Sequence, residues 1–156
     1  MLKLTKKADY GLIALKHLSN QGPIASSSAK EIAETYHIPL PLLAKVLQKL
    51  VKSGFLRSEH GTNGGYRLAR EAASINALEV IRAIDGPIIL TSCFTDHEAC
   101  GQSHACNVRE PLRKIHEGIL GLLANITIAD MNDENPDSRL YTLESAPGAN
   151  LQELPI

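Results

Sequence analysis

The stretch "HIPLPLLAKVLQKLVKSGFLRSEHGTNGGYRLAR", residues 37–70, changes its hydrophobic period near its middle. Its first half predicts a helix, because apolar residues recur at i, i+3, i+4 and i+7 from Leu43 to Leu50 and form one buried stripe. Pro41 suits the first turn of this helix, and Gly54 suits its end.

The second half of the stretch predicts a β-hairpin. "FLRSE" and "GYRLA" are short strand-like runs, and Asn63-Gly64 between them is a strong turn signal. A helix followed at once by such a hairpin is typical of a recognition helix and its wing.

Two more helices are expected before this stretch. Residues 5–19 place apolar side chains at helical spacing after Thr5, which stands at an N-cap position. Ser28-x-x-Glu31 is a capping box that begins a short second helix, and only a short link separates it from the third. We therefore predict a mainly α fold with a small β-hairpin wing: a winged helix-turn-helix.

Charge divides the chain into a basic first part and an acidic remainder. Up to residue 70 there are eleven Lys or Arg and four Asp or Glu, a net charge of +7, and the remainder carries −8. This asymmetry indicates either a polyanion partner for the first part or a well-solvated basic surface. The exposed face of the third helix favours double-stranded DNA, because such a helix fits a major groove about 12 Å wide. We expect contacts from the helix residues Pro41, Leu42, Ala44, Lys45, Gln48 and Lys49, and from the wing residues Arg57, His60, Thr62, Asn63 and Arg67.

A further capped helix begins at Asn76, and "VREPLRKIHEGILGLLANITIADM", residues 108–131, predicts one long helix. Its apolar residues are spaced 3, 4, 3, 4, which is a heptad seam for a second chain or, alternatively, a face packed on the same domain. Gly118 and Gly121 favour the close approach of another helix. The expected dimer seam consists of Leu112, Ile115, Ile119, Leu122 and Ile126.

These patterns divide the chain into three expected regions. A winged helix-turn-helix domain occupies residues 1–72, a helix with the cysteine loop and the dimerisation helix occupies 73–131, and a flexible tail occupies 132–156. The composition, with 44% hydrophobic and 21% charged residues, is that of a globular protein. No signal peptide or membrane-length apolar run is present, so we expect a soluble, cytoplasmic protein without membrane contact.

All three cysteines lie within "SCFTDHEACGQSHACNV", residues 92–108. A reducing cytosol disfavours disulfides, and three thiols leave one over, so Cys93, Cys100 and Cys106 indicate a metal or redox site. Thiolates suit iron–sulfur clusters and zinc, but the C-x6-C-x5-C spacing is wider than that of a zinc knuckle. A cluster normally needs four ligands, and His97 and His104 are local candidates for the fourth.

Four stretches together resemble the Rrf2 family of bacterial regulators: "LTKKADYGLIALKHL", "LLAKVLQKLVKSGFL", "GTNGGYRLAR" and "ANITIADM". The resemblance runs from Leu4 to about Met131 and includes the three-cysteine loop. The family includes the iron–sulfur regulators IscR, NsrR and RirA and the regulators of the Suf assembly system. The stretch "LTKKADYGLIALKHL" is most similar to the Suf regulators.

The resemblance implies a homodimer, paired through the long helix, that binds a palindromic promoter site and carries a 2Fe-2S or 4Fe-4S cluster on the three cysteines. In some relatives the fourth ligand is a histidine three residues past the last cysteine, where this chain has Arg109. In others it is an acidic residue of the partner's first helix, which Asp9 matches, so we rank Asp9 before His104 and His97. Relatives often open the recognition helix with serines, where this chain has Pro39 and Pro41, so their operator cannot be carried over.

The expected function is a cluster-sensing repressor of genes for iron–sulfur assembly, iron supply or oxidative and nitrosative stress. To change its DNA occupancy from 1:99 to 99:1, the state of the cluster must favour the DNA-binding conformation by roughly 5.5 kcal/mol. An alternative keeps the DNA-binding fold and uses the cysteines as a cluster-free thiol redox switch or a zinc site. An enzyme with a nucleophilic cysteine near His104 is not expected, because no nucleophile signature surrounds these thiols.

Overall fold

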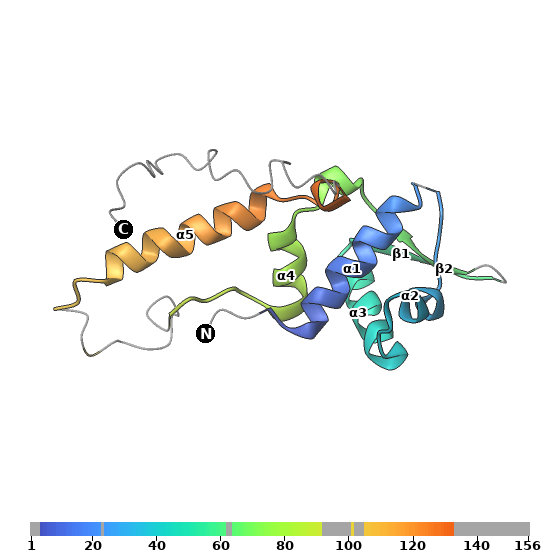
Figure 1. Ribbon diagram of the computed structural model, residues 1–156, viewed down its shortest axis with the longest axis horizontal. Helices are drawn as coiled ribbons and strands as arrows, with labels where there is room; N and C mark the ends of the chain where they lie inside the picture. Colours follow the sequence, from blue (N-terminus) through green and yellow to red (C-terminus); the bar gives the residue numbers. More distant parts are fainter. Residues whose placement is uncertain (1–3, 23, 62–63, 92–100, 102–104, 133–156) are drawn as a thin grey trace.

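A computed structural model describes residues 4–22, 24–61, 64–91, 101 and 105–132 of the chain. Its elements, in chain order, are α1 (Lys6–Asn20), α2 (Ala29–Tyr36), α3 (Leu40–Lys52), β1 (Leu56–Glu59), β2 (Gly65–Leu68), the 3₁₀ turn η1 (Ala72–Ser74), α4 (Ala77–Asp85), α5 (Arg109–Asn125) and the 3₁₀ turn η3 (Asp130–Asn132). Helices α1 to α4 and the hairpin form a body from which α5 extends (Figure 1). The predicted mainly helical fold with a hairpin wing is confirmed.

Three helices begin at the residues whose side chains were expected to cap them. Thr5 Oγ1 accepts a hydrogen bond from the Ala8 N–H at 3.3 Å, and Ser28 Oγ accepts one from Glu31 at 3.1 Å. Asn76 Oδ1 accepts one from the Glu79 N–H at 2.9 Å. Each cap satisfies a backbone donor that the helix cannot, a contribution of about 1 kcal/mol.

The hairpin is antiparallel, with Leu56 opposite Leu68 and Arg57 opposite Arg67. A bridge to Ser27 anchors it to the segment before α2: the Ser27 N–H donates to Tyr66 O at 3.1 Å, and the Tyr66 N–H donates to Ser27 O at 2.8 Å. The wing is therefore fixed to the body along β2 and does not depend on its own two strands alone.

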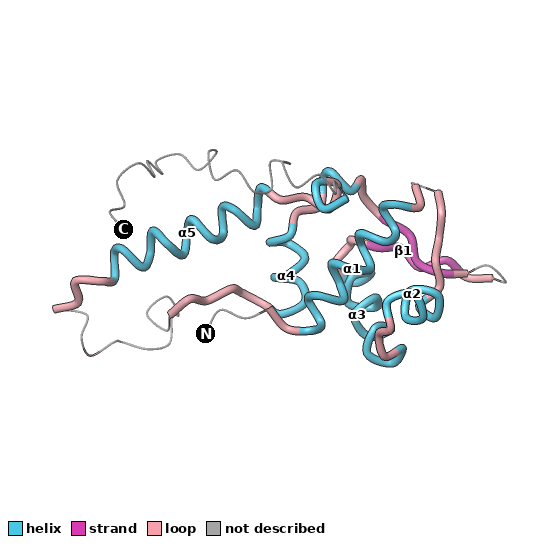
Figure 2. Tube along the Cα trace, viewed as in Figure 1, coloured by secondary structure: helices cyan, strands magenta, loops and turns pink. Residues whose placement is uncertain are grey.

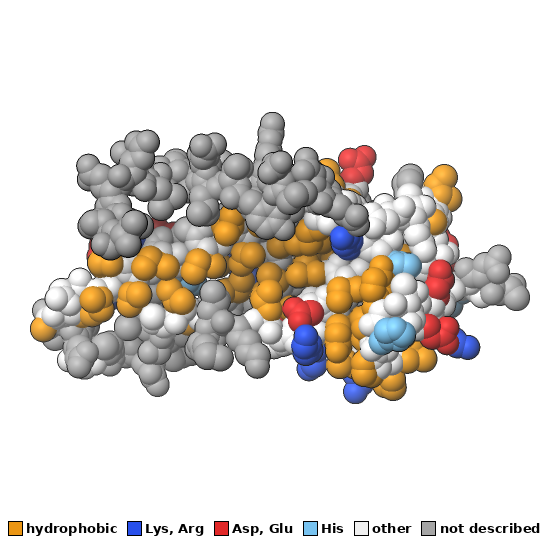
Figure 3. All heavy atoms as spheres, in the orientation of Figure 1, with side chains coloured by type: hydrophobic (Ala, Val, Ile, Leu, Met, Phe, Trp, Pro, Cys, Tyr) orange, Lys and Arg blue, Asp and Glu red, His pale blue; other side chains and the backbone are white. Residues whose placement is uncertain are grey.

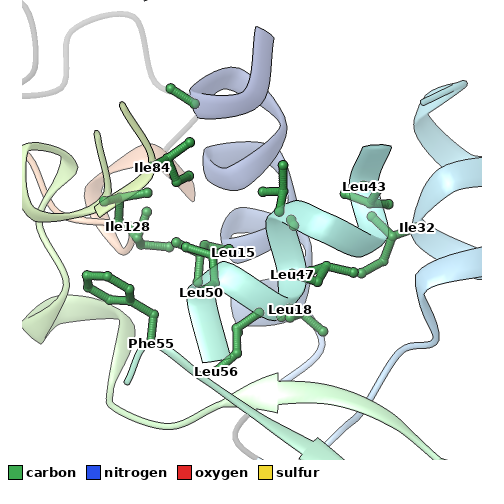
Figure 4. Close-up of a cluster of buried hydrophobic side chains, with 14 of the residues drawn as sticks. Leu15, Leu18, Ile32, Leu43, Leu47, Leu50, Phe55, Leu56, Ile84 and Ile128 are labelled. Carbon is green, nitrogen blue, oxygen red and sulfur yellow. The ribbon is translucent and has the colours of Figure 1, made fainter. Parts of the chain in front are cut away.

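One core cluster joins α1, α3, α4 and the segment after α5. Leu15, Leu47, Leu50 and Ile128 are fully buried, and Figure 4 shows side chains from these elements packed together. Because α4 and Ile128 share the core of the preceding helices, the cluster is continuous across residue 72. The boundary that we place there stays a prediction.

The predicted helix over 108–131 is wrong at its C-terminal end, because α5 ends at Asn125. Ile126 has extended backbone, with φ −92° and ψ 115°, and its carbonyl accepts a hydrogen bond from Ala77. The Thr127 N–H donates to Asp130 Oδ2 at 2.8 Å, and this side-chain bond favours a turn here over continuation of the helix. Figure 2 shows the loop that follows α5. Ile126, the last residue of the expected seam, therefore lies beyond the helix.

Among the helices that the structure describes, none is both long enough and apolar enough to cross a membrane.

Candidate nucleic-acid interface

Helix α3 has one buried face and one exposed face. Leu43, Leu47 and Leu50 are fully buried against the core, which fixes the direction in which the remaining side chains point. Lys45 and Gln48 are exposed on the opposite face, together with Pro41 and Lys52, while Leu42 and Ala44 are half-buried. The structure thus places the expected contact residues of this helix at or beside one surface, and Lys49 is exposed there too.

The first turn of α3 has no polar side chain. Pro39 is the N-cap residue and makes no side-chain hydrogen bond, and every residue from Ile38 to Ala44 is apolar. The Leu40 side chain is 42% exposed, although leucine is among the residues most often buried. Lys45 is the first residue of α3 that can form a hydrogen bond through its side chain.

Lys49 faces another element of the body. Its Nζ donates a hydrogen bond to the carbonyl oxygen of Ile84, at a distance of 2.7 Å. Ile84 is in the last turn of α4, where carbonyls lack helical partners and a positive charge is stabilised by the helix dipole. Sequence reasoning missed this contact, because the periodicity of α3 shows only that Lys49 is off the buried stripe.

The wing brings Arg57 and Arg67 directly opposite each other on one face of the hairpin. Glu59, next to them on the same face, forms an ion pair with Arg67 at 2.5 Å, which offsets the repulsion between the two guanidinium groups. Arg57 and His60 are exposed, while Thr62 and Asn63 lie outside the described residues. Among the ion pairs of the described residues, Arg67 is paired with Glu59 and Arg57 is not paired with a carboxylate.

A histidine that sequence reasoning missed connects the wing anchor to two helices. His17 Nδ1 lies 3.1 Å from the Tyr36 hydroxyl of α2, and its Nε2 lies 3.1 Å from Oγ of the buried Ser27. Ser27 also donates to Gln21 Oε1 at 2.7 Å. This network, built from α1, α2 and the strand partner of Tyr66, positions the wing relative to the helix-turn-helix.

The C-terminal end of α4 is bonded to the start of α1 as well as to α3. Asp85 Oδ1 accepts a hydrogen bond from the Thr5 hydroxyl at 2.6 Å, and Oδ2 accepts one from the Thr5 N–H at 3.2 Å. Beyond Asp85 the chain leads toward the cysteines. The last turn of α4 is therefore held by the recognition helix and by the helix that carries Asp9.

The expected metal ligands are only partly described. Cys106 is a free, half-buried thiol three residues before α5, whereas Cys93, Cys100, His97 and His104 lie outside the described residues. Asp9, on the first turn of α1, is half-exposed and forms an ion pair with Lys6 at 3.2 Å. The described ranges contain no group of three His, Cys, Asp or Glu side chains that could hold a metal.

Asp9 and Cys106 are not brought together within the chain. The N-terminal end of α5, next to Cys106, lies well apart from α1 in Figure 1. If both residues bind one cluster, the aspartate must belong to a second subunit.

Helix α5 exposes an apolar face along its length. Ile115 is 52% exposed and Leu122 is 44% exposed, and Figure 3 shows hydrophobic side chains in a row over this helix. Leu112 and Ile119 are half-buried, while Leu123 packs against the core cluster.

Ion pairs join Arg113 to Glu110 and Glu117, away from that apolar face of α5. The hydrogen bond from Arg113 lowers the pKa of the Glu110 carboxyl, and the two carboxylates raise the pKa of Arg113. The helix is thus charged on one side and apolar on the side that carries Ile115 and Leu122.

Comparisons with known proteins agree with this architecture. The Rrf2 family, described as an iron-dependent transcriptional regulator, matches residues 4–134. The structure of CymR (YrzC), the global cysteine regulator of B. subtilis, is 27% identical with a TM-score of 0.74, covering 86% of this chain and 99% of the other. The oxidized form of Staphylococcus aureus CymR is 25% identical with a TM-score of 0.67, covering 85% and 98%. T. potens IscR is 29% identical with a TM-score of 0.64, covering 83% and 85%.

Proposed function

The chain belongs to the Rrf2 family of transcriptional regulators, and from this premise we propose that it is a cytoplasmic, homodimeric repressor that senses an iron–sulfur cluster. The observation that carries the proposal is the position of the three cysteines. They lie between α4, which is bonded to the recognition helix, and α5, which presents an apolar face for a second subunit.

We assign DNA contact to the exposed face of α3 and to the wing. Lys45, Gln48 and Arg57 are exposed, and a wing arginine can bind phosphate while the helix lies in the major groove. A twofold dimer doubles this surface, so a palindromic site with half-sites one or more helical turns apart is expected.

Lysine variants of α3 test this assignment by the salt dependence of DNA binding. Each phosphate contact contributes about 0.9 to the slope of log K against log salt. We therefore expect Lys45→Met or Lys52→Met to reduce the slope by about 1.8 per dimer, since each change occurs twice. The measurement is a titration of labelled operator DNA at several potassium chloride concentrations.

Lys49→Met is the matched control in the same helix. Because the Lys49 ammonium is bonded to Ile84 O, we expect the slope to stay as in the wild type. The free energy of unfolding should instead fall by about 1 kcal/mol, the contribution of one charged hydrogen bond at a helix end. A slope reduced as much as by Lys45→Met would show that Lys49 contacts phosphate.

The donor set fits an iron–sulfur cluster. Cys93, Cys100 and Cys106 would supply three thiolates, and Asp9 of the partner subunit would supply an oxygen ligand. When bound, the cluster supplies an iron with one non-thiolate ligand, which responds to iron supply, oxidants or nitric oxide. The separation of α1 from the start of α5 supports an aspartate from the second chain.

The two ends of the cysteine segment connect it to the elements that bind DNA and to the proposed dimer helix. Its first end leaves α4, where Ile84 O holds Lys49 of α3 and Asp85 holds Thr5 of α1. Its second end enters α5, the proposed dimer helix. A change in the conformation of residues 86–108 therefore acts on the recognition helix and on the spacing of the two subunits together.

Anaerobic purification tests the cluster. We expect visible absorption, iron and acid-labile sulfide in the wild-type protein, and their loss in Cys106→Ala. Asp9→Ala should weaken retention of iron, whereas Lys6→Ala should not, because it removes the ion pair with Asp9 but keeps the carboxylate. Protein that contains neither iron nor sulfide, yet represses normally, would falsify the proposal.

A second candidate is a cluster-free thiol redox or zinc-dependent regulator with the same DNA surface. The similarity to the oxidized form of Staphylococcus aureus CymR favours it. In that case the anaerobic protein is colourless, and mild oxidation or zinc removal changes its DNA affinity while iron has no effect.

A further inference from the structure

The first two residues of the recognition helix are apolar and lie where a helix-turn-helix protein touches base edges. Leu40 and Pro41 occupy the first turn of α3, and both are exposed. In this class of fold the N-terminal residues of the recognition helix reach into the major groove. Hydrogen-bond readout is unavailable to them, because neither side chain carries a donor or an acceptor.

Only one feature of the major-groove edge of unmodified DNA is apolar. Thymine presents its C5-methyl group there, while the other groups on the four base-pair edges are hydrogen-bond donors, acceptors or the small C5–H of cytosine. An exposed leucine set against a donor or acceptor would desolvate that group without replacing its hydrogen bond, at a cost in binding free energy. Against a methyl group the same side chain buries apolar surface on both sides.

The surroundings of this turn favour DNA as its occupant. Lys45 follows one helical turn later on the same face of α3, and Arg57 of the wing is also exposed. The lower right of Figure 3 shows hydrophobic side chains next to Lys or Arg side chains on the body that holds α2 and α3. Basic groups beside an apolar tip allow phosphates to fix the helix in the groove while the tip contacts the bases.

From these observations, and resting on the proposed DNA-binding function, we infer that Leu40 and Pro41 read thymine C5-methyl groups in each half-site of the operator. Specificity at these positions thus comes from van der Waals contact. Gln48, about two turns further along α3, supplies the hydrogen-bonding part of the readout, while Lys45 contacts phosphate.

The test replaces thymine by deoxyuridine, which keeps the base pair and its O4 acceptor and removes only the methyl group. The operator is first selected with the full-length protein from a pool of random duplexes. Each thymine of the selected half-site is then exchanged singly. We expect at least one exchange to weaken binding about fourfold, the value of one buried methyl group, and the paired exchange in both half-sites to weaken it about fifteenfold.

A double-mutant cycle connects the methyl group to the protein. In Leu40→Ala/Pro41→Ala, the thymine and deoxyuridine operators should bind with affinities within about twofold of each other. Ile24→Ala, which truncates a side chain that is 86% exposed outside the proposed interface, should keep the full discrimination. Because the first comparison alters only the DNA, it is independent of the folding of any variant.

The possible outcomes distinguish failure of the DNA-binding function from failure of the thymine inference. A pool that yields no enriched duplex contradicts the DNA-binding function itself. A selected operator whose every deoxyuridine form binds as tightly as the thymine form overturns only the thymine inference. Discrimination that persists in Leu40→Ala/Pro41→Ala overturns the assignment to this turn.

Discussion

In the proposed dimer, replacing Ile115 and Leu122 by aspartate is expected to separate the subunits and to weaken binding to the proposed palindromic operator by 100-fold or more. Both side chains are about half exposed on α5, and two charges buried at a dimer seam have no partner to offset their desolvation. A monomer contacts one half-site at a time, so it loses the gain of about 10² to 10⁴ that linked binding events provide.

Sedimentation velocity and titration of the operator with each protein measure the two effects. Arg113→Ala is the matched control, because it changes the charged side of the same helix and leaves Ile115 and Leu122 in place. It should remain a dimer and bind DNA as the wild type does. A dimer that persists in the double aspartate variant would place the subunit interface elsewhere.

Gly65→Ala is expected to lower the free energy of unfolding by about 2–3 kcal/mol, as overpacking against rigid neighbours does. A Cβ atom at this position would lie 2.6 Å from Ser27 O and 2.7 Å from Ser27 C. Both atoms belong to backbone held by the bridge between Ser27 and Tyr66, so neither can move without breaking that bridge. DNA affinity should fall as well, because the wing is displaced from α3.

Urea unfolding of Gly65→Ala, compared with Ser58→Ala at an exposed residue of β1, measures this effect. Ser58→Ala should unfold close to the wild-type urea concentration. Gly11→Ala should destabilise the protein less than Gly65→Ala, since the close contact of its Cβ would be with the flexible end of the Ile84 side chain rather than with backbone. Equal midpoints for Gly65→Ala and Ser58→Ala would contradict the close approach of the hairpin to Ser27.

The elements that follow local rules were predictable from the sequence. Thr5, Ser28 and Asn76 cap their helices because a side-chain oxygen needs only the amide three residues on. The end of α5 was not predictable in the same way. It depends on a hydrogen bond from Ala77 to Ile126 and on the burial of Ile128, both of which involve residues distant in sequence.

The sequence was enough to predict which face of the recognition helix is exposed, but not which side chains of the site bond to other elements. The apolar stripe of α3 correctly separates buried residues from exposed ones, but helical periodicity cannot reveal that Lys49 meets the end of α4. The proposed role of Asp9 requires a second subunit, and the sequence of one chain gives no distance between subunits. For the same reason the His17 network was missed, since Ser27 and Tyr36 become its neighbours only after folding.

Among the described residues, helix α5 is held to the body at its C-terminal end, by Ile128 and the backbone bonds of residues 126–129, and Cys106 lies near its N-terminal end. Its 17 residues make a lever about 25 Å long. A displacement of about 2 Å at the tip swings such an arm by about 5° around its base. Carried across half-sites about 34 Å apart, the same angle moves one recognition helix by about 3 Å, which is enough to break its hydrogen bonds to base edges.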